Sequence, residues 1–203
     1  MASAPLFMSK SGKEPHPFEI CVVRRNELRG EQASALAWLE ASLAAKEISN
    51  SSSPLPNRAI LLELQGRECH SGIAQAVSPP IDLTATTSLQ ILASDTDKAR
   101  LFIVSFLTAP KSEHRELRTK FQIYIKKIFG DSKFDPLFSY LAPLASGSDI
   151  LLSVWTFENH RDVDVYMPSE EHVNFGNSVQ SVFTNVEFFQ ATVADSKMKG
   201  ARL

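Results

Sequence analysis

The stretch LLSVWTFENHRDVDVYMPSEEHVNF, residues 151–175, decides how this chain folds. It begins with apolar, β-branched and aromatic residues, which predict a strand that ends just after Trp155. Polar turns follow, and Ser169 with two glutamates after it is typical of the start of a helix. The turns and the first helical turn carry His160, Tyr166 and His172. We therefore predict one passage from strand to helix that holds candidate site residues.

The segments on either side complete a β-α-β-β-α-β unit over residues 100–194. Apolar runs with strand character occupy residues 101–107, 137–144, 150–157 and 186–193. A helix between the first two runs begins near Pro110 and ends at Gly130, a residue that suits a helix C-terminus. Its apolar stripe consists of Leu117, Phe121, Tyr124, Ile125 and Ile128. This order predicts a ferredoxin-like layer in which helices cover one face of the sheet.

Residues 18–94 give a less regular version of the same unit. Strand-like runs occupy residues 18–24, 59–65 and 88–93. The alanine-rich residues 31–49 predict a helix, and residues 71–77 predict one or two helical turns. We expect an α+β protein of two ferredoxin-like halves, the first degraded, packed sheet to sheet as an α/β barrel. A flexible tail, residues 1–17, and a polar tail, residues 195–203, flank them.

The composition excludes several classes of protein. The chain has 203 residues and is 43% hydrophobic, so it can bury a core. Its 21 basic and 23 acidic residues are mixed along the sequence, which argues against nucleic acid or an anionic membrane as partner. We find no secretory leader and no apolar run long enough to span a bilayer, and we expect a cytoplasmic protein.

Motifs for the best-known catalytic sites are missing from the sequence. The five histidines show no HxH, HxxxH or HExxH spacing, and the two cysteines lie far apart, so we expect no metal. The segment GRECHSG lacks the pattern of a phosphate loop, and no Gly-x-Ser-x-Gly elbow occurs. We likewise expect no organic cofactor.

The candidate catalytic residues are His172, His160 and Tyr166. His172 is either exposed in the first turn of its helix or tilted toward a cavity, where a near-neutral pKa suits a general base. His160 lies in the charged run ENHRD and is either a solvated loop residue or a second base. The Tyr166 hydroxyl offers a hydrogen bond to a quinone or enolate oxygen, or else has a structural role.

The candidate substrate-binding residues are mostly rings. Trp155 points to the side of its strand opposite Val154, where it is either a core ring or a wall that stacks on a flat substrate and donates one N–H. The others are Tyr140, Phe106, Phe175 and Asn174. The rings would line a cavity, and the Tyr140 hydroxyl either binds a substrate oxygen or has a structural role. The Asn174 amide either orients a carbonyl or lies on the surface of its helix.

The strand end SVWTFENH, residues 153–160, and the segment VYMPSEEHVNF, residues 165–175, resemble the antibiotic-biosynthesis-monooxygenase type of dimeric α/β-barrel protein. The superfamily also contains haem-degrading enzymes and polyketide cyclases. The matching positions are Trp155, Glu158, Tyr166, Ser169, His172 and Phe175. The resemblance covers about the last 95 residues, and the first half departs more from the pattern. It implies a homodimer or, with two halves in one chain, a monomer.

The resemblance implies a cofactor-independent enzyme of secondary metabolism. Such an enzyme would oxygenate or cyclise an aromatic or polyketide-like small molecule in an apolar pocket. A non-catalytic ferredoxin-like module that docks another chain is the main alternative, and a haem-handling protein is the third. A cavity of ~300 Å³ or more that touches Trp155 and a histidine would favour the enzyme, whereas a filled core with an outer apolar patch would favour the module.

Overall fold

The computed structural model describes residues 4–24, 58–64, 67–70, 72–76, 86–95 and 98–192. The helix expected at residues 31–49 and the polar tail expected at residues 195–203 lie outside these ranges. In the described part, no helix has the length and apolar character needed to cross a membrane.

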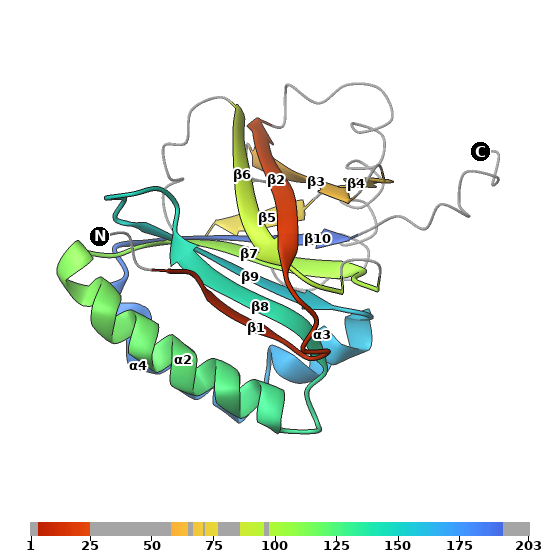
Figure 1. Ribbon diagram of the computed structural model, residues 1–203. Helices are drawn as coiled ribbons and strands as arrows, with labels where there is room; N and C mark the ends of the chain where they lie inside the picture. The colour runs from red at the N-terminus through yellow and green to blue at the C-terminus, as the bar shows by residue number, and fades with distance from the viewer. Residues whose placement is uncertain are drawn as a thin grey trace, which may run out of the picture.

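A six-stranded antiparallel sheet forms the centre of the molecule (Figure 1). Its middle strands are β7 (Leu101–Thr108), β8 (Pro136–Pro143), β9 (Ile150–Phe157) and β10 (Asn185–Thr192). They lie in the order β8-β9-β7-β10, flanked by β1 (Leu6–Ser9) and β5 (Gly72–Ala76). The observed order of elements confirms the β-α-β-β-α-β order expected for the second half. Each of its strands is an apolar run of strand length in the sequence.

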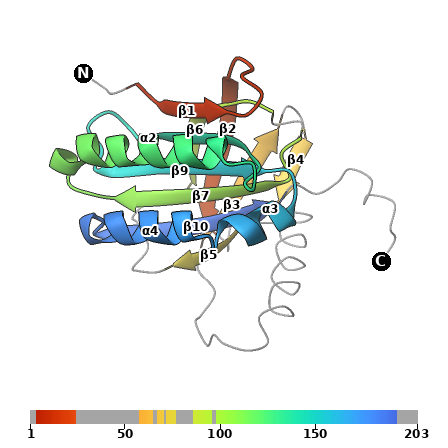
Figure 2. The same ribbon diagram turned by 90° about the horizontal axis from the view of Figure 1, so that it is seen from below.

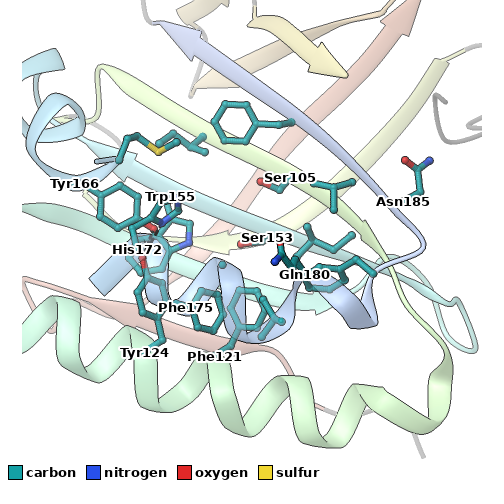
Figure 3. Close-up of a pocket in the computed structure, with 18 of the residues that line it drawn as sticks. Ser105, Phe121, Tyr124, Ser153, Trp155, Tyr166, His172, Phe175, Gln180 and Asn185 are labelled. Carbon is teal, nitrogen blue, oxygen red and sulfur yellow. Dashed lines mark hydrogen bonds between the residues drawn. The ribbon is translucent and has the colours of Figure 1, made fainter. Parts of the chain in front are cut away.

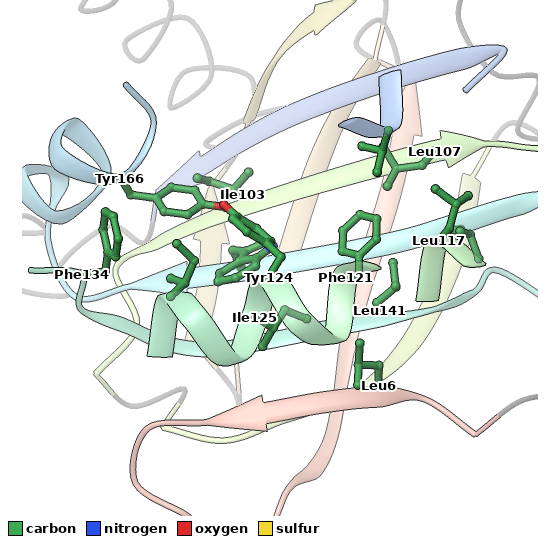
Figure 4. Close-up of a cluster of buried hydrophobic side chains, with 14 of the residues drawn as sticks. Leu6, Ile103, Leu107, Leu117, Phe121, Tyr124, Ile125, Phe134, Leu141 and Tyr166 are labelled. Atoms are coloured by element: carbon green, nitrogen blue, oxygen red, sulfur yellow. The ribbon is translucent and has the colours of Figure 1, made fainter. Parts of the chain in front are cut away.

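Helices cover one face of this sheet (Figure 2). Helix α2 (His114–Gly130) follows a short 3-10 turn, η2 (Lys111–Glu113), and its predicted stripe is buried against the sheet (Figure 4). Helix α4 (Glu170–Val179) begins after Ser169 as expected and continues into η3 (Gln180–Val182). Helix α3 (His160–Tyr166) replaces one of the expected turns, because the side chain of Asn159 accepts a hydrogen bond from Asp162 N and caps a short helix.

The other face of the six-stranded sheet packs against a second sheet, which crosses it in Figure 1. That sheet has the order β4-β3-β2-β6, from β2 (His16–Arg24), β3 (Arg58–Leu64), β4 (Arg67–His70) and β6 (Thr86–Ala93). Ile91 and Ala93 of β6 join the buried cluster between the two sheets. The remaining buried members of this cluster are Ala99, Phe102, Val104, Phe106, Leu137, Phe138, Tyr140, Ala142, Leu152 and Val154.

Three expectations for the first hundred residues are corrected. Residues 6–9, expected in a flexible tail, form β1 and pair with β8, with Leu6 buried. Residues 72–76, expected as helical turns, form β5, which supplies an edge strand beside β10. In the second sheet β2 pairs directly with β3, whereas β9 separates the first two strands of the second half, so the described part of residues 18–94 lacks the ferredoxin-like order.

Candidate active site

A cavity of about 570 Å³ lies between the six-stranded sheet and helices α2 and α4 (Figure 3). Strands β7, β9 and β10 form its floor, and α2, α4 and the residues around η3 form its walls. Its lining is mostly apolar and aromatic, and none of the described residues that line it carries a carboxylate, ammonium or guanidinium group. The position and lining are typical of a site for a small, uncharged organic molecule.

Strand alternation decides which side chains reach the cavity. On β7 and β9 the odd-numbered residues face the helices, and the even-numbered ones face the second sheet. Trp155 lies opposite Ile103 in the register, and Ser153 lies opposite Ser105. The expected orientation of Trp155, away from the side of Val154, is confirmed.

Tyr124, Tyr166 and His172 meet at one end of the cavity (Figure 3). The Tyr124 hydroxyl donates to the Tyr166 hydroxyl at 2.8 Å and lies 3.0 Å from Nδ1 of His172. In the tautomer with the proton on Nδ1, His172 donates to the Tyr124 oxygen, and this tautomer fits a bond donated by Tyr124 to Tyr166. In this arrangement Nε2 carries the free lone pair of a neutral imidazole, and Tyr166 keeps its own O–H for another acceptor.

Burial keeps these three groups uncharged. It raises the pKa of Tyr124 far above the ordinary range of a phenol. Burial also raises the pKa of Tyr166, and the neighbouring Tyr124 raises it further. The same burial lowers the pKa of His172. At neutral pH the site therefore presents a neutral imidazole, which is the form that accepts a proton.

Rings fix the geometry around these groups. Phe175 stacks on Tyr124, with ring centroids 4.1 Å apart and an interplanar angle of 6°. Trp155 lies 5.3 Å from the ring of Tyr166 and is 4% exposed. The indole N–H of Trp155 has no hydrogen-bond acceptor among the residues that the structure describes. This N–H is therefore available to a ligand in the cavity.

The first turn of α4 places His172 inside. Ser169 is the N-cap residue, and its Oγ accepts a hydrogen bond from the backbone N–H of His172 at 3.2 Å. Glu171 is bound from outside by the Lys133 ammonium at 2.8 Å, and this ion pair holds the turn against the segment that follows α2. Of the two alternatives for His172, the one in which the helix start tilts toward the cavity is therefore the observed one.

The structure brings together four of the eight residues singled out in the sequence. Trp155, Tyr166, His172 and Phe175 line the cavity. The other four do not line the cavity; they are His160, Asn174, Tyr140 and Phe106.

The four residues outside the cavity are displaced for simple geometric reasons. His160 is the first residue of α3 and is exposed, and Asn174 is exposed on α4, where its amide reaches Glu170 at 3.4 Å. Tyr140 and Phe106 have even numbers on their strands and so face the second sheet. Burial there raises the pKa of Tyr140.

Tyr124 is the main site residue that the sequence did not single out. It was placed in the apolar stripe of α2, and the signal was its hydroxyl, the one hydrogen-bonding group in that stripe. The polar lining residues Ser105, Ser153 and Gln180 were also missed, since a serine inside an apolar strand carries no motif. No cluster of metal-ligating side chains occurs among the described residues.

Comparisons with known proteins place the fold. No family model and no curated protein matches the chain. A candidate monooxygenase from Fusobacterium nucleatum subsp. nucleatum is similar in structure, with a TM-score of 0.51 and 7% identity over 91% of this chain and 94% of that one. The chain has the fold of this monooxygenase-like protein. The resemblance found in the sequence is thus confirmed at the level of the fold.

Two further solved structures are also similar. A candidate monooxygenase from Lactobacillus acidophilus NCFM has a TM-score of 0.46 and 8% identity, over 90% of this chain and all of that one. An anthrone oxidase-like protein has a TM-score of 0.47 and 5% identity, over 94% of this chain and 95% of that one.

Proposed function

We propose that the cavity binds an uncharged aromatic or polyketide-like molecule and that His172 removes a proton from it. The observation that carries the proposal is the contact of 3.0 Å between Nδ1 of His172 and the Tyr124 hydroxyl, at the wall of an apolar cavity. Because Nδ1 faces Tyr124 of α2, the basic Nε2 on the other side of the ring points away from that tyrosine. Burial lowers the pKa of His172, so the base is present in its neutral form at pH 7.

The proposed step produces an anion that the site stabilises. Nε2 of His172 takes the proton of a phenol or an activated methylene, and the electron pair stays on the substrate as a phenolate or enolate. Tyr166 O–H and Trp155 N–H are the donors positioned to bind its oxygen. Exclusion of water by the surrounding rings strengthens these hydrogen bonds.

Two outcomes are open to that anion. With dioxygen, a methylene carbon gains one oxygen atom, passes through a hydroperoxide, and loses water, so that CH₂ becomes C=O. With a ketone in the same molecule, the enolate carbon attacks the carbonyl, His172 returns the proton to the new alkoxide, and a ring closes. Neither sequence of steps uses a metal or an organic cofactor.

The cavity also bears on the alternative of a non-catalytic docking module. Such a module needs a filled core and an outer apolar patch. Here about 570 Å³ lies open beside Trp155 and His172. The space supports the enzyme as the better proposal.

The test replaces the base and a matched histidine. His172→Ala is expected to lower kcat by about 10²- to 10⁴-fold, the usual contribution of a general base. His160→Ala, an exposed histidine of α3 outside the cavity, is the control and is expected to leave kcat unchanged. Substrates are multi-ring phenols with an activated methylene and linear poly-ketones, followed by oxygen consumption and by product mass after ¹⁸O₂ labelling.

The readouts distinguish oxygenation from cyclisation and test the role of His172. Label in the product supports oxygenation, and ring closure without oxygen uptake supports cyclisation. Equal rates in the wild type and in His172→Ala would contradict the proposal that His172 is the general base. No turnover of any member of either series by the wild type would remove the enzyme proposal.

A further inference from the structure

The protein's own packing does not explain why residue 176 of α4 is a glycine. It lies in the interior of the helix, where glycine is less favourable than alanine because it loses more backbone freedom on folding. Its backbone is not in the left-handed region, and a Cβ built at this position would meet no atom within 4 Å. Neither conformation nor crowding therefore requires glycine here.

Gly176 lies on the side of α4 that lines the cavity. His172, Gly176 and Gln180 are spaced by four residues, so they form one row along the cavity side of α4 and η3. At 1.5 Å per residue the row is ~12 Å long, with Gly176 in the middle. Gln180 is exposed at one end of this row, and Trp155 is buried beside His172 at the other end.

The strands that form the floor of the cavity offer hydrogen bonds toward the Gln180 end of the row. Ser153 and Ser105 are register partners on β9 and β7 and both line the cavity. Ser153 lies two residues from Trp155, or ~7 Å along the strand. Within the described part of the chain, neither serine hydroxyl has a hydrogen-bond partner. The cavity thus has a candidate base at one end and uncharged polar groups toward the other (Figure 3).

We propose that Gly176 is a specificity-determining residue, kept bare so that the middle of an elongated, uncharged ring system can lie across α4. The reacting end of the ligand lies at His172, and a carbonyl or hydroxyl at its other end contacts Ser105, Ser153 or Gln180. A side chain larger than a methyl group at position 176 would occupy the space of the middle ring. This inference rests on the proposed function, since it assigns the ligand of the same cavity.

The experiment measures binding by titration calorimetry with phenols of two, three and four linearly fused rings. Gly176→Leu is expected to weaken the three- and four-ring ligands by about tenfold or more, equivalent to about 1.4 kcal/mol, and to leave the two-ring ligand within about threefold. Gly176→Ala is expected to raise the melting temperature and to weaken only the largest ligand. Asn177→Ala, the next residue and exposed, is the control: it should raise the melting temperature without changing any affinity.

Four results would overturn the inference. The first is a Gly176→Leu variant that binds the large ligands as tightly as the wild type does, and the second is one that loses the two-ring ligand together with the larger ones. A lower melting temperature in Gly176→Ala would show that packing alone requires the glycine. Because binding is measured without turnover, a wild type that binds the series but never reacts contradicts the proposed function only, whereas a wild type that binds no member contradicts both proposals.

Discussion

At the scale of single residues, the site depends on how one histidine is held. His172 comes from the start of a helix, where imidazoles are commonly solvated, yet its Nδ1 lies 3.0 Å from a buried tyrosine hydroxyl. Burial alone lowers the pKa of its ring. The imidazole is thus fixed in orientation and uncharged, and these are the two conditions for a base that works in an apolar cavity.

This pKa shift predicts a dependence of activity on pH. The pKa of His172 lies below the value of about 6.5 that histidine has in a peptide. We expect kcat/KM to be constant near neutral pH and to fall on acidification, with a midpoint below pH ~6.5, because the imidazolium cannot accept a proton. A pH–rate profile of the wild type measures this limb. A midpoint above that value would contradict a buried base.

The same shift has a consequence for stability, whose sign follows from linkage. The unfolded chain binds a proton at residue 172 before the folded protein does, so acidification through about pH 6.5 and on through the lower folded pKa favours unfolding. In His172→Gln this contribution is absent. The difference in free energy of unfolding between the two proteins should therefore change in this pH window and stay constant above it.

The sequence predicted the residues that have periodicity or a motif to mark them. Trp155 and His172 were found because a strand end and a helix start place them, and the strand alternation around Val154 gave the correct side for Trp155. The same alternation, applied to Tyr140 and Phe106, gives the opposite side from the cavity. The sequence did not place these two side chains, because it does not show which face of the sheet the helices cover.

At the scale of elements, the start of α4 connects stability with the site. Ser169 caps the helix through the N–H of His172, and its own O–H donates to the Tyr166 carbonyl at 2.6 Å. One side chain therefore links the backbone of two members of the site. We regard Ser169 as a positioning residue.

Ser169→Ala is expected to lower the free energy of unfolding by about 1 kcal/mol, the usual cost of a lost N-cap. It should also lower kcat more than it changes KM, because His172 would lose its fixed place beside Tyr124. Ser169→Asn, a good cap without a charge, should restore most of both. Urea unfolding and steady-state kinetics measure the two effects. An alanine variant with wild-type stability and kcat would show that the cap does not position the base.

Element prediction succeeded where segments are long and periodic. Helix α2 and strands β7 and β9 have stripes or apolar runs of eight residues or more. It failed at β1, α3 and β5, which have four, seven and five residues. Elements this short obtain their stability from a neighbour, here β8 for β1 and β10 for β5, and the sequence of a segment does not name its neighbour.

At the scale of the whole molecule, one chain covers both faces of its central sheet. Helices α2 and α4 cover one face, and the other packs on the second sheet through a cluster that includes Ile91 and Ala93 of β6. The first residues of the chain strengthen this arrangement, since Phe7 contacts the Phe138 ring at a centroid distance of 6.2 Å and Lys13 forms an ion pair with Asp95 at 3.0 Å. The general α+β architecture followed from the element order, whereas the order within the second sheet did not.

The covered sheet predicts the state of association. A ferredoxin-like layer leaves one sheet face in need of a partner, and the resemblance therefore allowed either a homodimer or a monomer. Here residues of the same chain occupy that face, and the outer strands of the six-stranded sheet, β1 and β5, are short edges that make poor templates for pairing. We expect a monomer with a mass near 22.5 kDa in light scattering coupled to size exclusion, unchanged as the protein concentration is raised. Ile91→Lys, which places a charge between the sheets, should loosen their packing and make the mass rise with concentration. A wild-type mass of twice the chain, stable on dilution, would show instead that a second copy completes the molecule.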